Sequence, residues 1–253
     1  MKISIITICY NNAKELKSAI DSVLGQSYED IEYIIVDGGS CDGTQELVES
    51  YGNRIAKYTS EPDKGIYDAL NKGINLATGD FIGFMHSDDI YAHADVIKDV
   101  VEALKKNNSQ AIYSDLQYVD KNDTSLIKRF WTSGEYQKAK LKKGWMPPHP
   151  TLFLHKDIYQ LAKLPSGEYF DTSMKIAADY DFMVRILNKY DISPIYLPQV
   201  TVKMRVGGAS NRNLKALINK SKEDMRVMRR NGLNPWTTLF FKNFKIFKQI
   251  FKK

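Results

Sequence analysis

Short apolar runs that alternate with amphipathic segments constrain this chain more than any other feature. The runs "ISIITI", "IEYIIV" and "DFIGFM" are rich in β-branched and aromatic residues, which favour strands. Residues 13–26, 45–51, 65–77 and 94–107 carry the helical segments between and after them. Because the runs are too apolar for a sheet with one wet face, they predict an α/β fold with a mainly parallel central sheet and helices on both faces.

The second half of the chain is less regular. Residues 110–120 are predicted to be a strand that continues the sheet, and 175–190 to be a loop that enters a helix. Residues 193–208, "SPIYLPQVTVKMRVGG", resemble edge strands that lead into a glycine-hinged loop. There is no internal repeat or low-complexity linker, so residues 1–210 are predicted to form a single domain.

Carboxylates follow two of the predicted strands. In open α/β sheets, ligands bind beyond the carboxyl ends of the strands. Asp37 follows "IEYIIV" and precedes two glycines, which allow the backbone to come close to a ligand. Asp88 and Asp89 follow "FIGFM". One of them could cap the next helix, whereas a hard divalent cation with oxygen ligands accounts for both.

Other patterns narrow the chemistry. A dinucleotide fold requires G-x-G-x-x-G after the first strand, but "TICYNN" contains no glycine. Asp179 and Asp181 could cap a helix, or one of them could be a general base that faces a cleft. The histidines lack zinc-site spacing, and His86 and His93 are expected at the surface.

Charge is unevenly distributed along the chain. From residue 211 onward there are 12 lysines and arginines against two acidic residues, whereas the whole chain has 36 against 30. A nucleic-acid-binding protein would carry its basic surface on the folded body, so no nucleic-acid partner is expected. The basic segment at 211–253 indicates instead contact with an anionic surface.

The amino terminus runs directly into a strand and shows no signal peptide, and no run reaches the roughly 20 apolar residues of a membrane span. Two cysteines without metal or redox spacing fit a reducing compartment. A cytoplasmic location is therefore expected.

Four segments in order, "SIITICYNN", "AIDSVLGQSYEDIEYIIVDGGSCDGT", "DKGIYDALNKGINLATGDFIGFMHSDD" and "ADYDFMVR", resemble the family 2 glycosyltransferases of the GT-A fold. The resemblance covers residues 1–210. It implies an inverting enzyme that transfers a sugar from a nucleotide-diphosphate sugar, with a UDP-sugar favoured, and that uses a divalent metal, Mn²⁺ or Mg²⁺. It also implies a nucleotide-sugar half at 1–115 and an acceptor half at 116–210.

The resemblance assigns roles to residues of this sequence. For the donor it implies a base and ribose pocket formed by Thr7, Tyr10 and Asp37. It implies that Gly65, Asp68 and Asn71 belong to a segment that flanks the ribose and diphosphate, and that Arg205 belongs to a loop that closes over the donor. Asp37 would accept a hydrogen bond from a pyrimidine ring. Ser87 replaces the first aspartate of the family's D-x-D motif, so Asp88 would face the donor and Asp89 would bind the metal.

On the opposite side of the sugar, the resemblance implies a base and an acceptor. Asp179 matches the catalytic base, although Ala178 stands where an acidic residue often precedes it. His149, in "PPHPT", is expected on the acceptor side.

The last segment has its own pattern. Aromatic residues at helical spacing form one stripe, which consists of Trp236, Phe240, Phe244, Phe247 and Phe251. Lysines form the other side, at Lys242, Lys245, Lys248 and Lys252. The pattern favours a helix on anionic lipid at the inner face of the plasma membrane, serving a lipid-linked glycan acceptor in polysaccharide biosynthesis. The alternative is a helix docked on the domain with its lysines in solvent.

Two other functions remain open at this stage. A nucleotidyltransferase would be expected to show a glycine-rich basic loop after the first strand, where this chain has "TICYNNAKEL". A non-catalytic nucleotide-sugar sensor or assembly scaffold would have no use for a base at Asp179.

Overall fold

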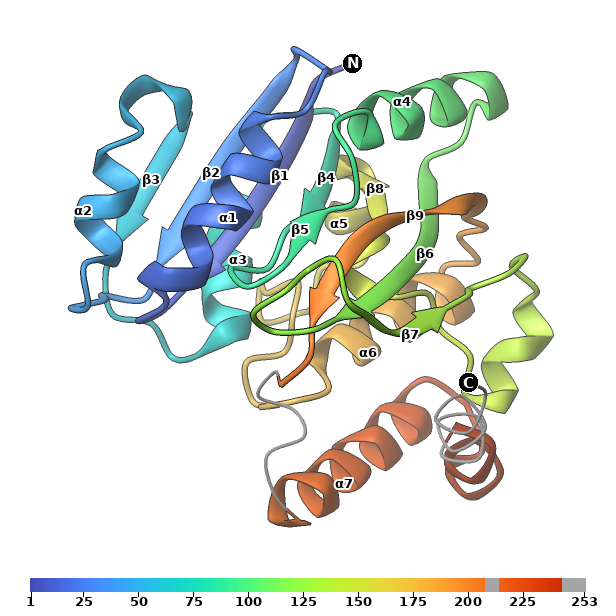
Figure 1. Cartoon of the computed structure of the whole chain (residues 1–253). Coiled ribbons are helices and arrows are strands. Elements are labelled where there is room, and N and C mark those ends of the chain that lie inside the picture. Colours follow the sequence, from blue (N-terminus) through green and yellow to red (C-terminus); the bar gives the residue numbers. More distant parts are fainter. Residues whose placement is uncertain (208–213, 243–253) are drawn as a thin grey trace.

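The structure, a computed structural model, describes residues 1–207 and 214–242. Within these residues, nine strands form one sheet in the order β3-β2-β1-β4-β8-β6-β9-β5, with β7 paired to β6 (Figure 1). The strands are β1 (Ile3–Cys9), β2 (Ile31–Asp37), β3 (Lys57–Ser60), β4 (Phe81–Phe84), β5 (Ile90–Tyr91), β6 (Ala111–Val119), β7 (Ile127–Trp131), β8 (Phe153–His155) and β9 (Ile195–Arg205).

Helices connect and cover these strands. They are α1 (Ala13–Leu24), α2 (Thr44–Glu49), α3 (Ile66–Leu76), α4 (Val96–Asn107), α5 (Lys156–Leu161), α6 (Ala178–Val184) and α7 (Leu214–Arg230). Shorter helical turns are η1 (Gly52–Arg54), η2 (Lys138–Lys143), η3 (His149–Thr151) and η4 (Arg185–Lys189). Residues 235–242 are also helical. Within the described part of the chain, no helix is long and apolar enough to cross a bilayer.

The predicted α/β fold is confirmed, although the sheet is less parallel than expected. β1 pairs in parallel with β2 and β4, and β2 with β3, as the βα alternation predicts. β8 then runs antiparallel between β4 and β6. The chain enters β8 from a proline-containing loop and not from a crossover helix, so a parallel direction is not imposed. β9, predicted at an edge, lies between β6 and β5.

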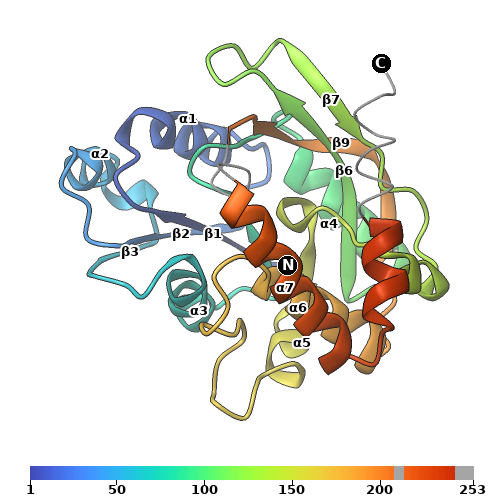
Figure 2. The same cartoon turned by 90° about the horizontal axis from the view of Figure 1, so that it is seen from below.

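Each face of the sheet carries its own apolar layer. One layer contains the buried faces of α1 and α4 together with the inward side chains of β1 and β2. The predicted face of α1 is buried there, at Leu16, Ala19, Ile20 and Val23. The other layer contains α3, α5 and α6. Figure 2 shows α1 and α2 on one side of the first strands and α3 on the other. Gly73 of α3 allows close packing, because a Cβ there would lie 2.4 Å from Ile6 Cγ2.

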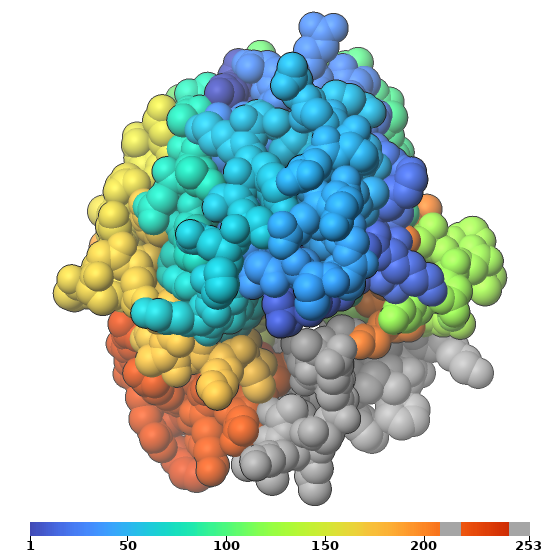
Figure 3. Space-filling view, turned by 90° about the vertical axis from the view of Figure 1, so that its left-hand side faces the viewer, coloured from blue at the N-terminus to red at the C-terminus, as the bar shows by residue number. Residues whose placement is uncertain are grey.

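α7 packs on the same layer as α3, α5 and α6. Val227 and Met228 are completely buried in that layer. The space-filling view shows the red-orange part of the chain directly below the yellow and gold second half (Figure 3). The division of the chain at residue 210 stays a prediction, but the described part of the second segment shares the core of the first.

A buried carboxylate stabilises the sheet at the edge where β2 begins. Glu32 accepts hydrogen bonds from Ser4 Oγ at 2.6 Å and from Thr78 Oγ1 at 2.6 Å. It also pairs with Lys2 and Lys57, at 3.1 and 3.2 Å. Burial acts to raise the pKa of Glu32, but these hydrogen bonds outweigh it and hold the pKa well below its usual range.

We expect Glu32→Gln to lower the free energy of unfolding at pH 7 by about 2 kcal/mol, because the network loses its charge and one acceptor. A carboxylate whose pKa is lowered by folding stabilises the protein above its unfolded pKa, about 4.3, and loses that contribution as pH falls below it. In urea unfolding, the difference from wild type should therefore shrink below about pH 4. The exposed Glu29→Gln is the control; an equal, pH-independent loss in both variants would contradict this role.

Candidate active site

The carboxyl ends of β1, β2 and β4 lie at one edge of the sheet and place polar segments side by side (Figure 1). Asp37, the last residue of β2, is completely buried there. Its Oδ2 accepts hydrogen bonds from the Ser40 N–H at 2.9 Å and from Ser60 Oγ at 2.6 Å, and its Oδ1 accepts one from Ser40 Oγ. Asp37 thus holds the "DGGS" turn in place, and its contact with a pyrimidine ring stays a prediction.

Asp88 and Asp89 form a turn after β4 that two distant segments hold. Asn12, the residue before α1, donates from Nδ2 to Ser87 Oγ at 2.9 Å. Arg205, the last residue of β9, donates its backbone N–H to Asp89 Oδ1 at 3.0 Å. The Arg205 guanidinium donates to the Asp88 carbonyl, to Ser18 Oγ and to the Lys121 carbonyl.

These contacts show a structural role for Arg205. Arg205 was expected to contact a donor diphosphate. In the structure each guanidinium nitrogen of Arg205 donates one hydrogen bond within the protein, which joins β9, α1 and the loop after β6 to the Asp88–Asp89 turn. One N–H on each terminal nitrogen is left over, so the contact with a donor stays a prediction.

The Asp89 carboxylate is left with an unsatisfied oxygen. Asp89 is 1% exposed, and its Oδ2 has no hydrogen-bond partner within the described residues. Burial, together with the adjacent charge of Asp88, raises the pKa of Asp89 well above its usual range. A bound cation would satisfy the oxygen and offset both costs.

The number of nearby ligands limits how a cation could be held. Within residues 1–207 and 214–242 there is no group of three or more histidine, cysteine or acidic side chains arranged to hold a metal ion. Two carboxylates fit a divalent ion that completes its coordination with substrate phosphates and water. The turn therefore fits the predicted metal, provided that the donor supplies further oxygens.

Asp179 is the second residue of α6. Its side chain is only partly exposed, and its Oδ1 accepts hydrogen bonds from the Tyr180 N–H at 2.8 Å and the Tyr67 hydroxyl at 3.3 Å. Burial raises the pKa of Asp179, while the positive charge of Lys242 opposes the rise. A carboxyl group with a raised pKa that stays partly exposed is suited to take up a proton.

His86, expected at the surface, is only partly exposed, and it precedes the Asp88–Asp89 turn in the chain. Burial lowers the pKa of His86, and the charges of both Asp88 and Asp179 act on it in the opposite direction. The charges of Asp88 and Asp179 thus both reach the His86 ring. The sequence feature that could have placed His86 near the site is its position directly before "SDD", at the end of a strand.

His149 packs against His86. The two rings stack with centroids 5.7 Å apart, and His149 also stacks on Phe84 at 5.1 Å. Burial lowers the pKa of His149 to about 3, so its ring is neutral at physiological pH. Neither nitrogen has a hydrogen-bond partner within the described residues. Its place on the acceptor side stays a prediction.

Two of the predicted donor contacts are structural residues instead. Thr7 is completely buried, and its hydroxyl hydrogen-bonds to the Tyr33 hydroxyl at 3.0 Å. The Asn71 amide donates to the Phe170 carbonyl and accepts from the backbone N–H groups of Tyr169 and Phe170. Thr7 therefore belongs to the core, and Asn71 fixes the loop that leads toward α6.

The remaining predicted donor residues lie at the surface near the strand ends. Tyr10 is 64% exposed, and its ring lies close to Gly38. Gly65 begins α3 with a φ of +117°, a conformation that suits glycine. Asp68, on the first turn of α3, accepts from the Lys64 N–H at 3.0 Å. The structure leaves all three accessible, and their contacts with a donor stay predictions.

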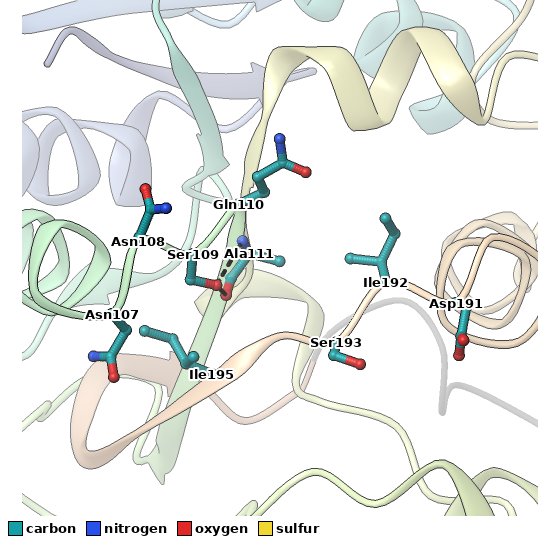
Figure 4. A pocket seen from close by; sticks show the side chains of 9 residues that line it. All are labelled: Asn107, Asn108, Ser109, Gln110, Ala111, Asp191, Ile192, Ser193 and Ile195. Carbon is teal, nitrogen blue, oxygen red and sulfur yellow. Dashed lines mark hydrogen bonds between the residues drawn. The ribbon is translucent and has the colours of Figure 1, made fainter.

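A separate pocket of about 550 Å³ lies at the other end of the sheet. Its lining is mostly polar and comes from the end of α4, the start of β6 and the loop before β9 (Figure 4). Ala111 and Ile195 in this lining begin the strands whose far ends lie beside the Asp88–Asp89 turn, roughly 30 Å away by strand rise. This pocket is not part of the candidate active site.

Solved structures share this fold. TarS from S. aureus, in a crystal structure with UDP-GlcNAc, superposes with a TM-score of 0.69 at 19% identity, over 91% of this chain and 65% of that one. A mannosyltransferase from Pyrobaculum calidifontis, in complex with GDP-Man and Mn²⁺, superposes with a TM-score of 0.65 at 16% identity, over 96% of this chain and 69% of that one. The predicted GT-A type of fold is thereby confirmed.

Sequence comparison gives the family. An uncharacterised glycosyltransferase of Rickettsia typhi is 32% identical over 222 residues, which are 83% of this chain and 66% of the relative; the chain thus spans slightly less than two thirds of that relative's length. The family described as "Glycosyl transferase family 2" matches residues 4–159, more than half of the chain. The chain therefore belongs to glycosyl transferase family 2.

Proposed function

We propose that this glycosyltransferase is an inverting, metal-dependent enzyme that moves a sugar from a UDP-sugar to a hydroxyl group of a glycan or lipid-linked glycan in polysaccharide biosynthesis. One observation carries the proposal: the Asp89 carboxylate, buried in the turn after β4, has an oxygen with no hydrogen-bond partner within the described residues. Asp179 is a separate, partly exposed carboxyl group that the Tyr67 hydroxyl of α3 holds by a hydrogen bond. The UDP-GlcNAc held by the TarS structure supports a nucleotide-sugar donor.

Asp89 would hold the divalent metal, with Asp88 beside the donor. When bound, the ion would stabilise the negative charge that develops on the leaving diphosphate. The Mn²⁺ in the Pyrobaculum mannosyltransferase structure supports this assignment. Arg205 would act indirectly, because its backbone N–H orients Asp89 and its guanidinium fixes the Asp88 carbonyl.

Asp179 would be the general base. Its Oδ1 accepts two hydrogen bonds, which leaves Oδ2 to take the proton from an acceptor hydroxyl. The deprotonated oxygen would attack the anomeric carbon from the face opposite the diphosphate, so the configuration at that carbon inverts. The diphosphate leaves with the bonding electron pair, and no covalent enzyme intermediate is needed.

A donor screen tests this function. Nucleotide diphosphate release is measured from UDP-, GDP- and dTDP-sugars with Mn²⁺, with Mg²⁺ and with EDTA. We expect metal-dependent release from at least one UDP-sugar, and an inverted anomer in the transferred product by NMR. Thermal stabilisation by UDP without any release from these donors would favour a binding module. If the protein neither binds UDP nor releases a nucleotide diphosphate, the proposal is overturned.

The C-terminal helical segment at 235–242 offers an apolar surface for a membrane. Trp236, Phe240 and Phe241 are 71%, 65% and 41% exposed. The exposed lysines Lys142 and Lys143 lie beside this segment, because Thr238 Oγ1 donates to the Lys142 carbonyl at 3.0 Å. Aromatic side chains flanked by lysines suit the interface of an anionic bilayer, such as the inner face of the plasma membrane.

The structure revises part of the predicted helix pattern. Trp236 and Phe240 are exposed as expected, but Lys242, predicted on the lysine-rich side, is turned into the protein. Phe244, Phe247, Phe251, Lys245, Lys248 and Lys252 lie outside the described residues.

We expect the triple change Trp236→Ala, Phe240→Ala and Phe241→Ala to lower partitioning onto phosphatidylglycerol vesicles at least about tenfold, because the interfacial apolar area is lost. Co-sedimentation measures the partitioning, and turnover of a soluble acceptor should be unchanged.

The control is Leu126→Ala with Phe130→Ala, two other exposed apolar residues, of which Phe130 lies on β7. Equal partitioning of the triple variant and wild type would contradict membrane contact by this surface.

A further inference from the structure

The helical segment at 235–242 is docked on the body of the protein by close contacts. Thr238 is completely buried and donates to the Lys142 carbonyl. Gly144 has a φ of +66°, and a Cβ there would lie 2.6 Å from Lys242 Cβ. No other residue would allow this approach without a shift of the helix.

Docking carries the Lys242 ammonium into the protein. Its Nζ lies 2.8 Å from Asp224 Oδ1, in an ion pair whose side chains are 11% and 5% exposed. The same Nζ lies 3.6 Å from the centre of the Tyr180 ring, a cation–π contact. A lysine this deeply buried is rare in proteins unless its charge is compensated.

The contacts of Lys242 lead directly to the base-bearing helix. Tyr180 follows Asp179, and its N–H is one of the two groups that donate to Asp179 Oδ1. α7 holds the start of the same helix, because the Glu223 carboxylate accepts hydrogen bonds from three successive N–H groups, those of Lys175, Ile176 and Ala177, at 2.9 to 3.0 Å. The C-terminal segment therefore supports the part of the chain that presents Asp179.

We propose that Lys242 is a positioning residue for the base: its buried ammonium, held between Asp224 and the ring of Tyr180, fixes the first turn of α6 and supplies positive charge beside Asp179. The reaction role of Asp179 rests on the proposed function, but the charge relation between the two residues does not. No part of the glycosyltransferase match at residues 4–159 reaches Lys242.

Several other groups act on these two residues. Tyr67 of α3 and His86 after β4 face Asp179, and His86 acts to lower its pKa, as Lys242 does. Around Lys242, Asp224 of α7 raises the lysine pKa, whereas burial and the charge of Lys220 lower it. Removal of the Lys242 charge leaves burial of Asp179 opposed only by its hydrogen bonds and His86.

A direct titration tests the inference without requiring turnover. The protein is labelled with ¹³C at the aspartate carboxyl groups, and the Asp179 signal is assigned by its loss in Asp179→Asn. We expect Lys242→Met to raise the Asp179 midpoint by about one pH unit, because a nearby positive charge is removed. Lys242→Arg keeps the charge and should leave the midpoint within about 0.3 units.

Lys242→Gln guards against a variant that does not fold. Glutamine can hydrogen-bond to Asp224 but carries no charge, so it should shift the midpoint as methionine does. The matched control is Lys143→Met, which removes an exposed lysine next to Gly144. An Asp179 midpoint that stays at its wild-type value in folded Lys242→Met or Lys242→Gln overturns the inference.

Turnover gives a second readout. If Asp179 is the base, the acidic limb of the kcat profile of Lys242→Met moves to higher pH by the same amount, so kcat falls about fivefold at the old midpoint and recovers at high pH. A merely structural role would lower kcat equally at all pH values. Retained turnover in Asp179→Asn, by contrast, would remove the base assignment and leave the NMR result standing.

Discussion

Replacement of Asp179 by asparagine is expected to lower kcat about a thousandfold while donor affinity stays within about threefold of wild type. Asparagine has the same shape and keeps an oxygen that accepts from the Tyr180 N–H and the Tyr67 hydroxyl, so the local hydrogen bonds are kept. Only the capacity to take up a proton is lost. Nucleotide release and calorimetry with UDP separate the two effects.

The same variant should be at least as stable as wild type. Burial raises the pKa of Asp179, so ionisation of this group at neutral pH costs folding free energy, and an uncharged side chain removes that cost. Asp191→Asn is a suitable control, since Asp191 is exposed and has a φ of +56° that asparagine tolerates. Turnover of Asp179→Asn within tenfold of wild type would remove Asp179 from the mechanism.

Replacement of Asp89 by asparagine should abolish the effect of metal on donor binding. We expect UDP affinity in the presence of Mn²⁺ to fall about a hundredfold, to the value measured without metal, because Asp89 is the proposed protein ligand. Asparagine keeps an acceptor for the Arg205 N–H, which Asp89→Ala would lose. The change therefore tests the charge of Asp89 and not the shape of the turn.

Calorimetry with and without Mn²⁺ measures this effect. Asp95→Asn is the control, since Asp95 lies at the N-cap of α4 and asparagine is also favoured there. If Mn²⁺ strengthens UDP binding equally in wild type and Asp89→Asn, the ion is held elsewhere.

The sequence predicted the fold best where structure is local. The strands that became β1, β2 and β4 and the helices between them follow from apolar spacing within each segment. β8 could not be placed from its three residues, because its direction depends on pairing with β4 and β6. β9 was assigned to an edge for the same reason: nothing in its sequence reveals that β5 pairs with it.

Some residues of the candidate site could be recognised from the sequence and others could not, for physical reasons that differ by residue. Asp88 and Asp89 were recognisable because two adjacent carboxylates at a strand end need a compensating charge. Thr7 was misplaced because strand alternation decides which face a side chain takes, and its neighbours in β1 are apolar on both faces. The structural roles of Arg205 and Asn71 could not be predicted, because their polar groups bind backbone from distant loops.

Lys242 could not be predicted from its segment. Its spacing with Lys245 and Lys248 is that of a solvated lysine face, and only the approach allowed by Gly144 turns it inward. Long-range packing of this kind leaves no local pattern.

The Glu223 contact with three successive backbone groups has a consequence for protein engineering. A chimaera of two related enzymes could be joined at the end of the domain predicted at residues 1–210. Here such a junction, placed near residue 210, would pair the peptide groups before α6 with a carboxylate from a different parent. Hybrids that inherit residues 170–242 from one parent should keep the contact between Glu223 and the segment before α6. We expect them to express as active proteins more often than hybrids joined within residues 170–242.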